Sequence, residues 1–570
     1  SFEGVAGKNN RFKHITGIRY KTTQYLLSSL DTKGEYKPVF TDAQTNLSYD
    51  LTEKFEVSFL GYFSNNSYQF MPTTREIEFG TFQLPLKANI YYEGQESDKY
   101  RNIMGAVSFN YHNNENLNLK VIASSYYNKE AETFDLLGEY NINQVERNGG
   151  SDSLIRIGVG GFLNHARNFL SYDIENVSHV GSFNSSIGKT RWGITYQMEN
   201  VSDRLSEWEV IDSAGYIYPY SEKEINTLNP VYANNKISSF RFIGYLQHTF
   251  EIPISSEKFL LTIGLRSHYW SFNKENIFNP RLSLNYFPSW QKGLMLYTTI
   301  GKYSQPAFYK EMRNPEGVIN KNIKAQKATN FILGSDYIFY AWAHPFKFTA
   351  EMYYKKMNNL IPYRIDNVRS IYAGENLAKG YAVGMDVKLN GEFVKGTQSW
   401  ISISLLQTKE DIINDSYSLP SNPDSIIYPG YYPRPTDQLF NMNIFLQDYV
   451  PSYPDYKVFL SIHYGSALPV TVPINKRWDN VYKILPSYKR VDIGVSKVIK
   501  SQDKISKYKA LNLFKEVTVS LEVFNLIGIS NTVSFMWIKT FSDEEGIPAY
   551  FAVPNYLTSR RINFKISANF

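Results

Sequence analysis

Residue types that commonly perform chemistry are present but scattered along the chain. None of its eight histidines forms a pair at the spacing of helical metal ligands. The absence of cysteine excludes disulfides and thiolate-based sites. No serine–histidine or carboxylate constellation can be assembled either. We therefore expect no catalytic centre, no metal site, no cofactor and no enzymatic activity.

Two groups of tyrosine, tryptophan and arginine have a composition suited to ligand binding. Aromatic faces beside guanidinium groups bind planar or sugar-like ligands through stacking and cation–π contacts. Packing of loops and of a membrane-interface girdle would use the same residue types, so both interpretations stay open. The predicted substrate-binding residues are Tyr428, Tyr431, Tyr432, Arg434, Arg477 and Trp478.

The elements that would position these residues follow a period of two. Between Arg561 and the final Phe570, apolar residues such as Ile562 and Phe564 alternate with polar ones such as Asn563. The period recurs in about 22 candidate strands, whereas open sheets rarely exceed roughly ten. Alternation with lipid on one face and a polar lumen on the other is typical of outer-membrane barrels. We predict an all-β fold, a transmembrane antiparallel β-barrel of about 22 strands formed by residues 1–570. A set of soluble β-sandwiches or a propeller is the competing fold.

Composition agrees with this prediction. Aromatic residues make up 16% of the chain, with 45 Tyr and 37 Phe, as expected for girdles at membrane interfaces. Mean hydropathy is −0.36, and no run approaches the roughly 18–20 apolar residues of a membrane helix. The net charge of +6 is spread along the chain, so we expect no nucleic-acid partner. No signal peptide precedes Gly7, which predicts a mature form or a fragment.

Connections between candidate strands are short and long by turns. Short turns such as 451–454 and 395–396 are predicted to face the periplasm, and long loops the exterior. The alternation predicts separate strands that begin near Leu117, Phe134, Leu154 and Val177. The predicted exterior loops are 64–86, 202–237, 303–328, 358–379, 409–435, 465–486 and 527–556.

Several stretches, in this order and spacing, resemble the barrel of TonB-dependent outer-membrane receptors. The resemblance covers essentially the whole chain, although each stretch alone is weakly specific. The stretches are NPRLSLNYFP at 279–288, YTTIGKYSQP at 297–306, AEMYYKKMNNLIPY at 350–363, YYPRPTDQ at 431–438, EVFNLIGISNTVSF at 522–535 and VPNYLTSRRINFKI at 553–566.

The resemblance implies import of a nutrient ligand, such as a siderophore, vitamin, saccharide or peptide. Import would cross the outer membrane of a Gram-negative bacterium and be driven through TonB. Phe2 to Lys21 looks like the first barrel strand, so the plug domain and TonB-contacting segment of the family are missing from this sequence. The chain is then part of a longer protein, its plug is a separate polypeptide, or the barrel is a scaffold. The implied partners are outer-membrane lipid, a plug domain, TonB through the missing segment and, for a scaffold, a surface lipoprotein.

The barrel also predicts roles for individual side chains. Arg19, Arg266 and Arg281 have apolar neighbours in sequence, so they are expected to face the lumen and meet a plug. Phe564 and Phe570, at the end of the chain, are expected to act as the barrel-assembly signal. The main rival function is a structural or assembly subunit of an outer-membrane complex. An open diffusion porin is a third possibility, which predicts ion conductance in planar bilayers.

Overall fold

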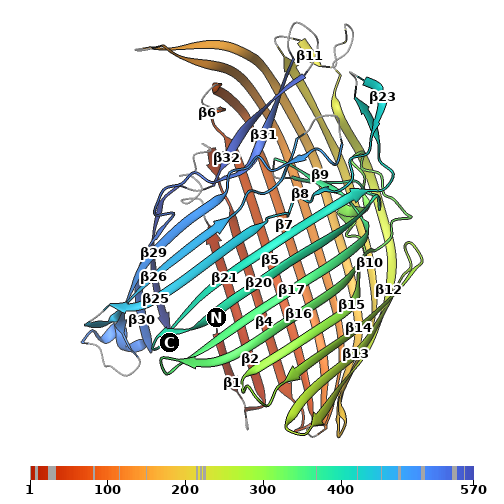
Figure 1. Ribbon diagram of the computed structural model, residues 1–570, viewed down its shortest axis with the longest axis vertical. Coiled ribbons are helices and arrows are strands. Elements are labelled where there is room, and N and C mark those ends of the chain that lie inside the picture. The colour runs from red at the N-terminus through yellow and green to blue at the C-terminus, as the bar shows by residue number, and fades with distance from the viewer. Residues whose placement is uncertain are drawn as a thin grey trace.

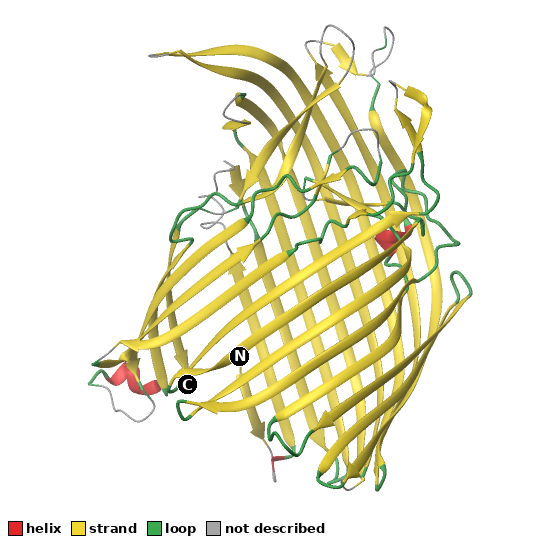
Figure 2. Ribbon diagram, viewed as in Figure 1, coloured by secondary structure: helices red, strands yellow, loops and turns green. Residues whose placement is uncertain are grey.

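The computed structural model describes most of the chain between residues 2 and 569. It does not describe residues 7–9, 23–33, 81–83, 114–115, 149–150, 214–215, 219–220, 222–225, 368, 420–421, 451, 473–476, 502–506, 542–547 and 558, nor the first and last residue. The described part is almost entirely β-strand, as Figure 2 shows.

A single 25-stranded antiparallel sheet forms the body of the molecule. Figure 1 shows this sheet curling into a barrel with tilted strands. In the described residues, 21 of the strands pair each with the next, and no pairing joins the first to the last. These wall strands are β1 (Phe2–Ala6), β2 (Phe12–Thr22), β4 (Val39–Asp50), β5 (Phe55–Pro72), β7 (Pro85–Asn113), β8 (Leu117–Asn148), β9 (Ser151–Ser185), β10 (Gly188–Ser213), β12 (Leu228–Ile254), β13 (Glu257–Trp270), β14 (Glu275–Phe287), β15 (Leu294–Gln305), β16 (Gln326–Ala341), β17 (His344–Leu360), β20 (Ala378–Val394), β21 (Thr397–Ile412), β25 (Phe440–Val450), β26 (Tyr453–Gly465), β29 (Tyr488–Lys500), β30 (Glu516–Phe524) and β33 (Arg561–Asn569).

Shorter elements extend or fill this wall. Four strands, β3 (Gly34–Tyr36), β6 (Arg75–Gly80), β11 (Tyr216–Tyr218) and β24 (Tyr432–Pro433), pair with longer ones. Four hairpins are separate: β18 (Tyr363–Asp366) with β19 (Arg369–Tyr372), β22 (Tyr417–Leu419) with β23 (Asn422–Ile427), β27 (Val470–Thr471) with β28 (Val481–Tyr482), and β31 (Thr532–Phe541) with β32 (Pro548–Tyr556). Two 3₁₀ turns are η2 (Tyr309–Met312) and η3 (Lys509–Leu513). No helix in the described part of the chain is long and apolar enough to cross a membrane.

The two faces of the wall differ as the alternation predicts. On β13, Ile263 and Leu265 are exposed on one face, whereas His268 and Trp270 are buried on the other. Exposed apolar side chains recur on neighbouring strands, for example Leu246 on β12. An apolar outer face and a polar inner face are the arrangement of a transmembrane barrel. The predicted all-β antiparallel barrel of about 22 strands is confirmed.

Five neighbouring strands, β7, β8, β9, β10 and β12, are much longer than a membrane crossing requires. A tilted transmembrane strand needs about 9–11 residues, whereas β8 has 32 and β9 has 35. Figure 1 shows these strands rising beyond the rest of the barrel. The hairpin β31–β32 packs on this extension, burying Ile538 and Val553 against Ile90 and Ile142.

These long strands correct part of the sequence interpretation. The separate strand starts near Leu117 and Phe134 fall within β8, and those near Leu154 and Val177 within β9. Much of the predicted exterior loop 202–237 belongs to β10 and β12. Above the membrane the outer face of a strand need not be apolar. The alternation of apolar and polar residues therefore ends there, although the hydrogen-bonded strand pairing continues.

Candidate functional site

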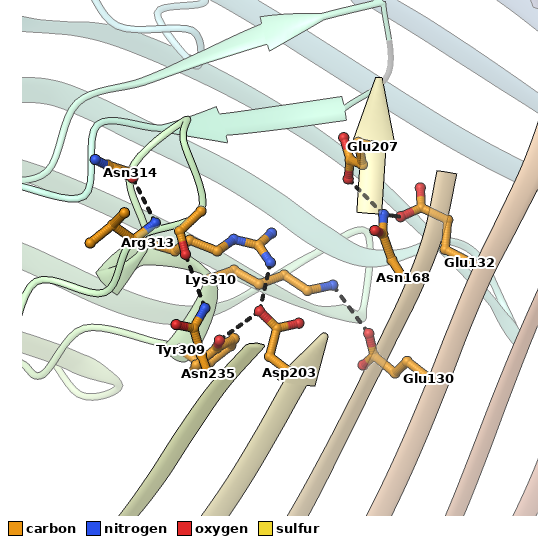
Figure 3. A network of polar contacts seen from close by, with 12 residues as sticks. Glu130, Glu132, Asn168, Asp203, Glu207, Asn235, Tyr309, Lys310, Arg313 and Asn314 are labelled. Carbon is orange, nitrogen blue, oxygen red and sulfur yellow. Dashed lines mark hydrogen bonds and ion pairs between the residues drawn. The ribbon is translucent and has the colours of Figure 1, made fainter. Parts of the chain in front are cut away.

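A group of carboxylates lies on the inner face of the long strands β7, β8 and β10. We call this group the acidic wall. Direct pairing places Asp98 opposite Glu132, and the neighbouring Asn168 on β9 donates to Glu132 at 3.0 Å and to Glu207 at 2.6 Å. Figure 3 shows this link between strands. The acidic wall comprises Glu96, Asp98, Glu130, Glu132, Asp203 and Glu207.

The acidic wall lies outside the membrane-spanning part of its strands. The outer face of β7 is apolar at Ile103 and Val107, and then carries the exposed charges of Arg101 and Lys99. On the adjacent strand β8, the exposed Lys129 lies directly opposite Arg101 in the strand register. Charged side chains on a lipid-facing surface are costly at the bilayer centre and tolerated near its interfaces. These charges therefore mark the outer interface, with the acidic wall at and beyond it.

A segment between β15 and β16, residues 306–325, docks on this wall. Asp203, which is 2% exposed, accepts a hydrogen bond from the Tyr309 hydroxyl at 2.6 Å and one from Arg313 at 3.0 Å. Lys310 lies 3.1 Å from Glu130 on β8. Figure 3 shows these three side chains of the segment directed at carboxylates of the wall. Charge-assisted hydrogen bonds of this kind are stronger than neutral ones.

The same segment has an apolar underside that seats it in the lumen. Met312 and Ile323 are buried, as is the ring of Tyr309. Their partners on the wall include Leu170 and Val201. Fully burying a side chain of this size contributes about 1.5–3 kcal/mol. The segment is thus anchored by apolar contact and oriented by the carboxylates.

The hairpin β18–β19 supplies a third cation to the acidic wall. The Arg369 guanidinium lies 3.2 Å from Glu132 and 3.2 Å from Glu207, which belong to β8 and β10. It also lies over the ring of Phe134, 5.6 Å from the ring centroid. One side chain therefore ties an exterior hairpin to two separate strands.

Negative charge in one corner of the wall exceeds the positive charge near it. Burial and the neighbouring carboxylates of Asp98 and Glu132 raise the pKa of Glu96 to about 7. Burial and Glu132 raise the pKa of Asp98 to about 6. Asp98 is only 9% exposed, and within the described part of the chain its Oδ1 atom has no hydrogen-bond partner. This corner can accept a further donor.

Two of the predicted ligand-binding residues are engaged within the protein. Tyr432 is buried and donates its hydroxyl to Glu410 at 3.0 Å. Arg434 donates to the other oxygen of Glu410, also at 3.0 Å. Glu410 itself is 1% exposed. This trio joins the end of β21 to β24 as a closed polar unit.

The other four predicted residues lie on the loops around this trio. Tyr428 is 72% exposed, and Tyr431 is exposed beside the ring of Tyr381. The structure brings the second loop close, since β24 contacts β28. Arg477 pairs with Asp479 and lies over the Tyr417 ring, and Arg364 lies over the Trp478 ring at 5.4 Å. A ligand-binding role for these residues stays a prediction.

Two of the three arginines expected to meet a plug contact other residues of the barrel. Arg19 pairs with Asp42 on the adjacent strand at 2.7 Å. Arg281 lies 4.3 Å from the centroid of the Tyr303 ring, and Arg266 is exposed on β13. Contact with a plug stays a prediction for all three.

The predicted assembly signal is described only in part. Phe564 is 63% exposed on β33, with exposed Ile562 and Ile566 two residues away on either side. Phe570 lies outside the described residues. Its role and that of Phe564 in assembly stay predictions.

Sequence reasoning missed the acidic wall. A usable signal was present, because Glu96 with Asp98 and Glu130 with Glu132 are acidic pairs spaced by two, which places each pair on one face of a strand. No group of three or more potential ligands in the described residues could hold a metal ion. In the described residues, the cations that contact the acidic wall are lysine and arginine side chains.

Comparison with known proteins gives a consistent family. A sequence profile described as TonB dependent receptor-like, beta-barrel matches residues 36–526. No curated protein matches the chain in sequence.

Similar solved structures share the fold at low sequence identity. One is FpvA of P. aeruginosa bound to heterologous pyoverdines, with a TM-score of 0.60, 10% identity, and coverage of 99% of this chain and 68% of that one. Another is the siderophore receptor PiuA from Acinetobacter baumannii, with 0.53, 12%, 99% and 82%. A third is the outer membrane transporter YddB from Escherichia coli, with 0.51, 11%, 99% and 81%.

Proposed function

Because the chain belongs to the TonB-dependent receptor-like β-barrel family, we propose that it imports a nutrient ligand across the outer membrane of a Gram-negative bacterium. Residues 1–570 act as the transmembrane barrel of that receptor. A plug domain, in the same or a separate chain, completes it and couples it to TonB. Siderophores are the first ligand class to test, since the structurally similar PiuA is a siderophore receptor.

The observation that carries this proposal is the docking of exterior segments on the inner wall. Residues 306–325 and the hairpin β18–β19 enter the lumen and are held there by ion pairs such as Arg313–Asp203. The carboxylates in these ion pairs belong to barrel strands and not to the docked segments themselves. Such contacts hold a mouth narrow at rest and can be exchanged for contacts with a ligand. Ligand capture would thus be coupled to a rearrangement of the segments that cover the lumen.

Uptake by living cells tests the proposal. Cells with and without the full-length gene are given a panel of ferric chelates, cobalamin, oligosaccharides and peptides, and depletion of each from the medium is measured. We expect one class to be depleted at least tenfold more slowly by the deletion strain, and a protonophore to remove the difference. Equal depletion of every class by both strains would refute import.

An assembly subunit is the second candidate, and one observation favours it. Residues 151–159 of β9 extend past its pairing with β10, which reaches Gly160. Within the described residues this edge of β9 has no paired strand, and it exposes Leu154, Ile155, Ile157 and Val159. Exposed apolar patches often mark protein-binding sites. A scaffold predicts that the deletion releases a surface lipoprotein from the outer membrane while uptake is unchanged.

A further inference from the structure

We propose that one corner of the acidic wall binds a guanidinium or primary ammonium group of the imported ligand, and that Arg369 occupies this seat until the ligand displaces it. This inference rests on the proposed import function and names a chemical feature of the substrate. We call the seat the cation corner. Its residues are Tyr68 and Phe70 on β5, Glu96 and Asp98 on β7, and Glu132 and Phe134 on β8.

Strand pairing places these six side chains on the same face. Asp98 is directly opposite Tyr68 on one side and Glu132 on the other. Glu96 is directly opposite Phe70 and Phe134 in the same two ladders. Residues directly opposite one another in antiparallel strands share a face and have Cβ atoms about 4.5–5.5 Å apart. Two rows of side chains therefore line the lumen here. In one row Glu96 lies between two aromatic rings, and in the other Asp98 lies between the Tyr68 ring and the Glu132 carboxylate.

The charges in the cation corner are out of balance. Three carboxylates meet there. Among the described residues Arg369 forms an ion pair with one of them, Glu132, and it also pairs with Glu207 outside the corner. The orphaned Oδ1 atom of Asp98 is buried within this group. A buried acceptor without a donor typically costs about 1–3 kcal/mol. A ligand with several N–H donors on a positive group would satisfy Asp98 and reduce the repulsion at once.

Arg369 shows what kind of group fits. Its guanidinium combines a carboxylate contact with Glu132 and a position over the Phe134 ring. Carboxylates together with aromatic faces attract organic cations, because both the charge and the ring quadrupole are favourable. Arg369 is carried by an exterior hairpin rather than by the barrel, so a ligand cation that replaces it also detaches that hairpin from the wall.

Peptide binding to the purified full chain in detergent tests the inference. The probes are tri-arginine and tri-citrulline, both acetylated at the amino terminus. Citrulline has nearly the same shape as arginine but an uncharged side chain, and binding is measured by isothermal titration calorimetry at fixed ionic strength. We expect tri-arginine to bind at least tenfold more tightly than tri-citrulline, and Asp98→Asn to remove most of that difference. Glu139→Gln, an exposed carboxylate elsewhere on β8, is the control and should leave binding unchanged.

Removal of the resident cation is the sharper test. Arg369→Ala should tighten tri-arginine binding severalfold, because the probe no longer competes with the hairpin. Lys310→Ala removes an equal charge from the Glu130 pair and should not have this effect. Equal binding by wild type and Asp98→Asn would overturn the inference, as would equal effects of Arg369→Ala and Lys310→Ala. Hydrogen exchange across the wall strands confirms that each variant is folded.

Binding in detergent requires neither TonB nor an energised membrane. A chain that binds tri-arginine at this corner but supports no uptake would refute the import function and leave the site. A chain that supports uptake but shows no difference between the two peptides would refute the cation corner and leave the import function.

Discussion

Two carboxylate sites in the mouth of the barrel differ in where the partners of the carboxylates come from. Glu410, at the end of β21, is matched by Tyr432 and Arg434 from the connection that follows it, and both of its oxygens are used. In the acidic wall the cations come from distant segments, and Asp98 keeps an unused oxygen. A carboxylate satisfied by its own connection holds the fold together. A carboxylate satisfied by a separate segment, or only in part, forms a contact that can be exchanged.

The largest expected effect is at Glu410. Arg434→Met removes the cation but leaves the buried carboxylate, and unpairing a buried charge costs about 3–5 kcal/mol. Chemical denaturation of the detergent-solubilised chain measures this loss. Adding Glu410→Gln to Arg434→Met should recover a substantial part of it, because the orphaned charge is gone. A double variant no more stable than the single one would show that Glu410 does not depend on Arg434.

A smaller and more local effect is expected at Asp203. Asp203→Asn weakens its bonds to Tyr309 and Arg313, which should cost about 1–3 kcal/mol in docking of residues 306–325. Amide hydrogen exchange in this segment should accelerate by tenfold or more while exchange in β15 and β16 is unchanged. Lys310→Ala is the control, since Lys310 is 53% exposed and exposed pairs contribute about 0–1 kcal/mol. Equal acceleration of amide exchange by both variants would show that Asp203 contributes no more than Lys310 to docking of this segment.

A local effect of similar size is a dependence of stability on pH in the cation corner. The pKa of Glu96 is raised to about 7 and that of Asp98 to about 6. Between about pH 4 and pH 7 the folded corner holds protons that the unfolded chain has released, so its stability falls as pH rises through this window.

Hydrogen exchange of the β7 and β8 amides around this corner measures the dependence. Local protection should be greater at pH 5 than at pH 8, by about 1–3 kcal/mol, since one pKa unit corresponds to about 1.4 kcal/mol. Asp98→Asn should flatten the dependence. The same slope in wild type and Asp98→Asn would assign it to other groups.

The sequence predicted the wall of the molecule better than its mouth. The alternation around Ile263 or Phe564 records a lipid face directly, so the barrel and its approximate strand number could be inferred. Beyond the membrane that contrast disappears, which is why β8 and β9 were each divided in two. The partners of Arg313 and Arg369 lie more than a hundred residues away, and a period of two carries no information about which loop folds inward.

The unequal strand lengths make the opening of the barrel asymmetric. At roughly 3.3 Å per residue the 35 residues of β9 measure about 115 Å along the strand, against about 30 Å for the nine residues of β30. The barrel is consequently taller along its long strands than at β30, where the connection to β33 is the exterior hairpin β31–β32. The inner face of the long strands carries the carboxylates of the acidic wall. If the barrel imports a ligand as proposed, this surface favours positively charged solutes over negatively charged ones.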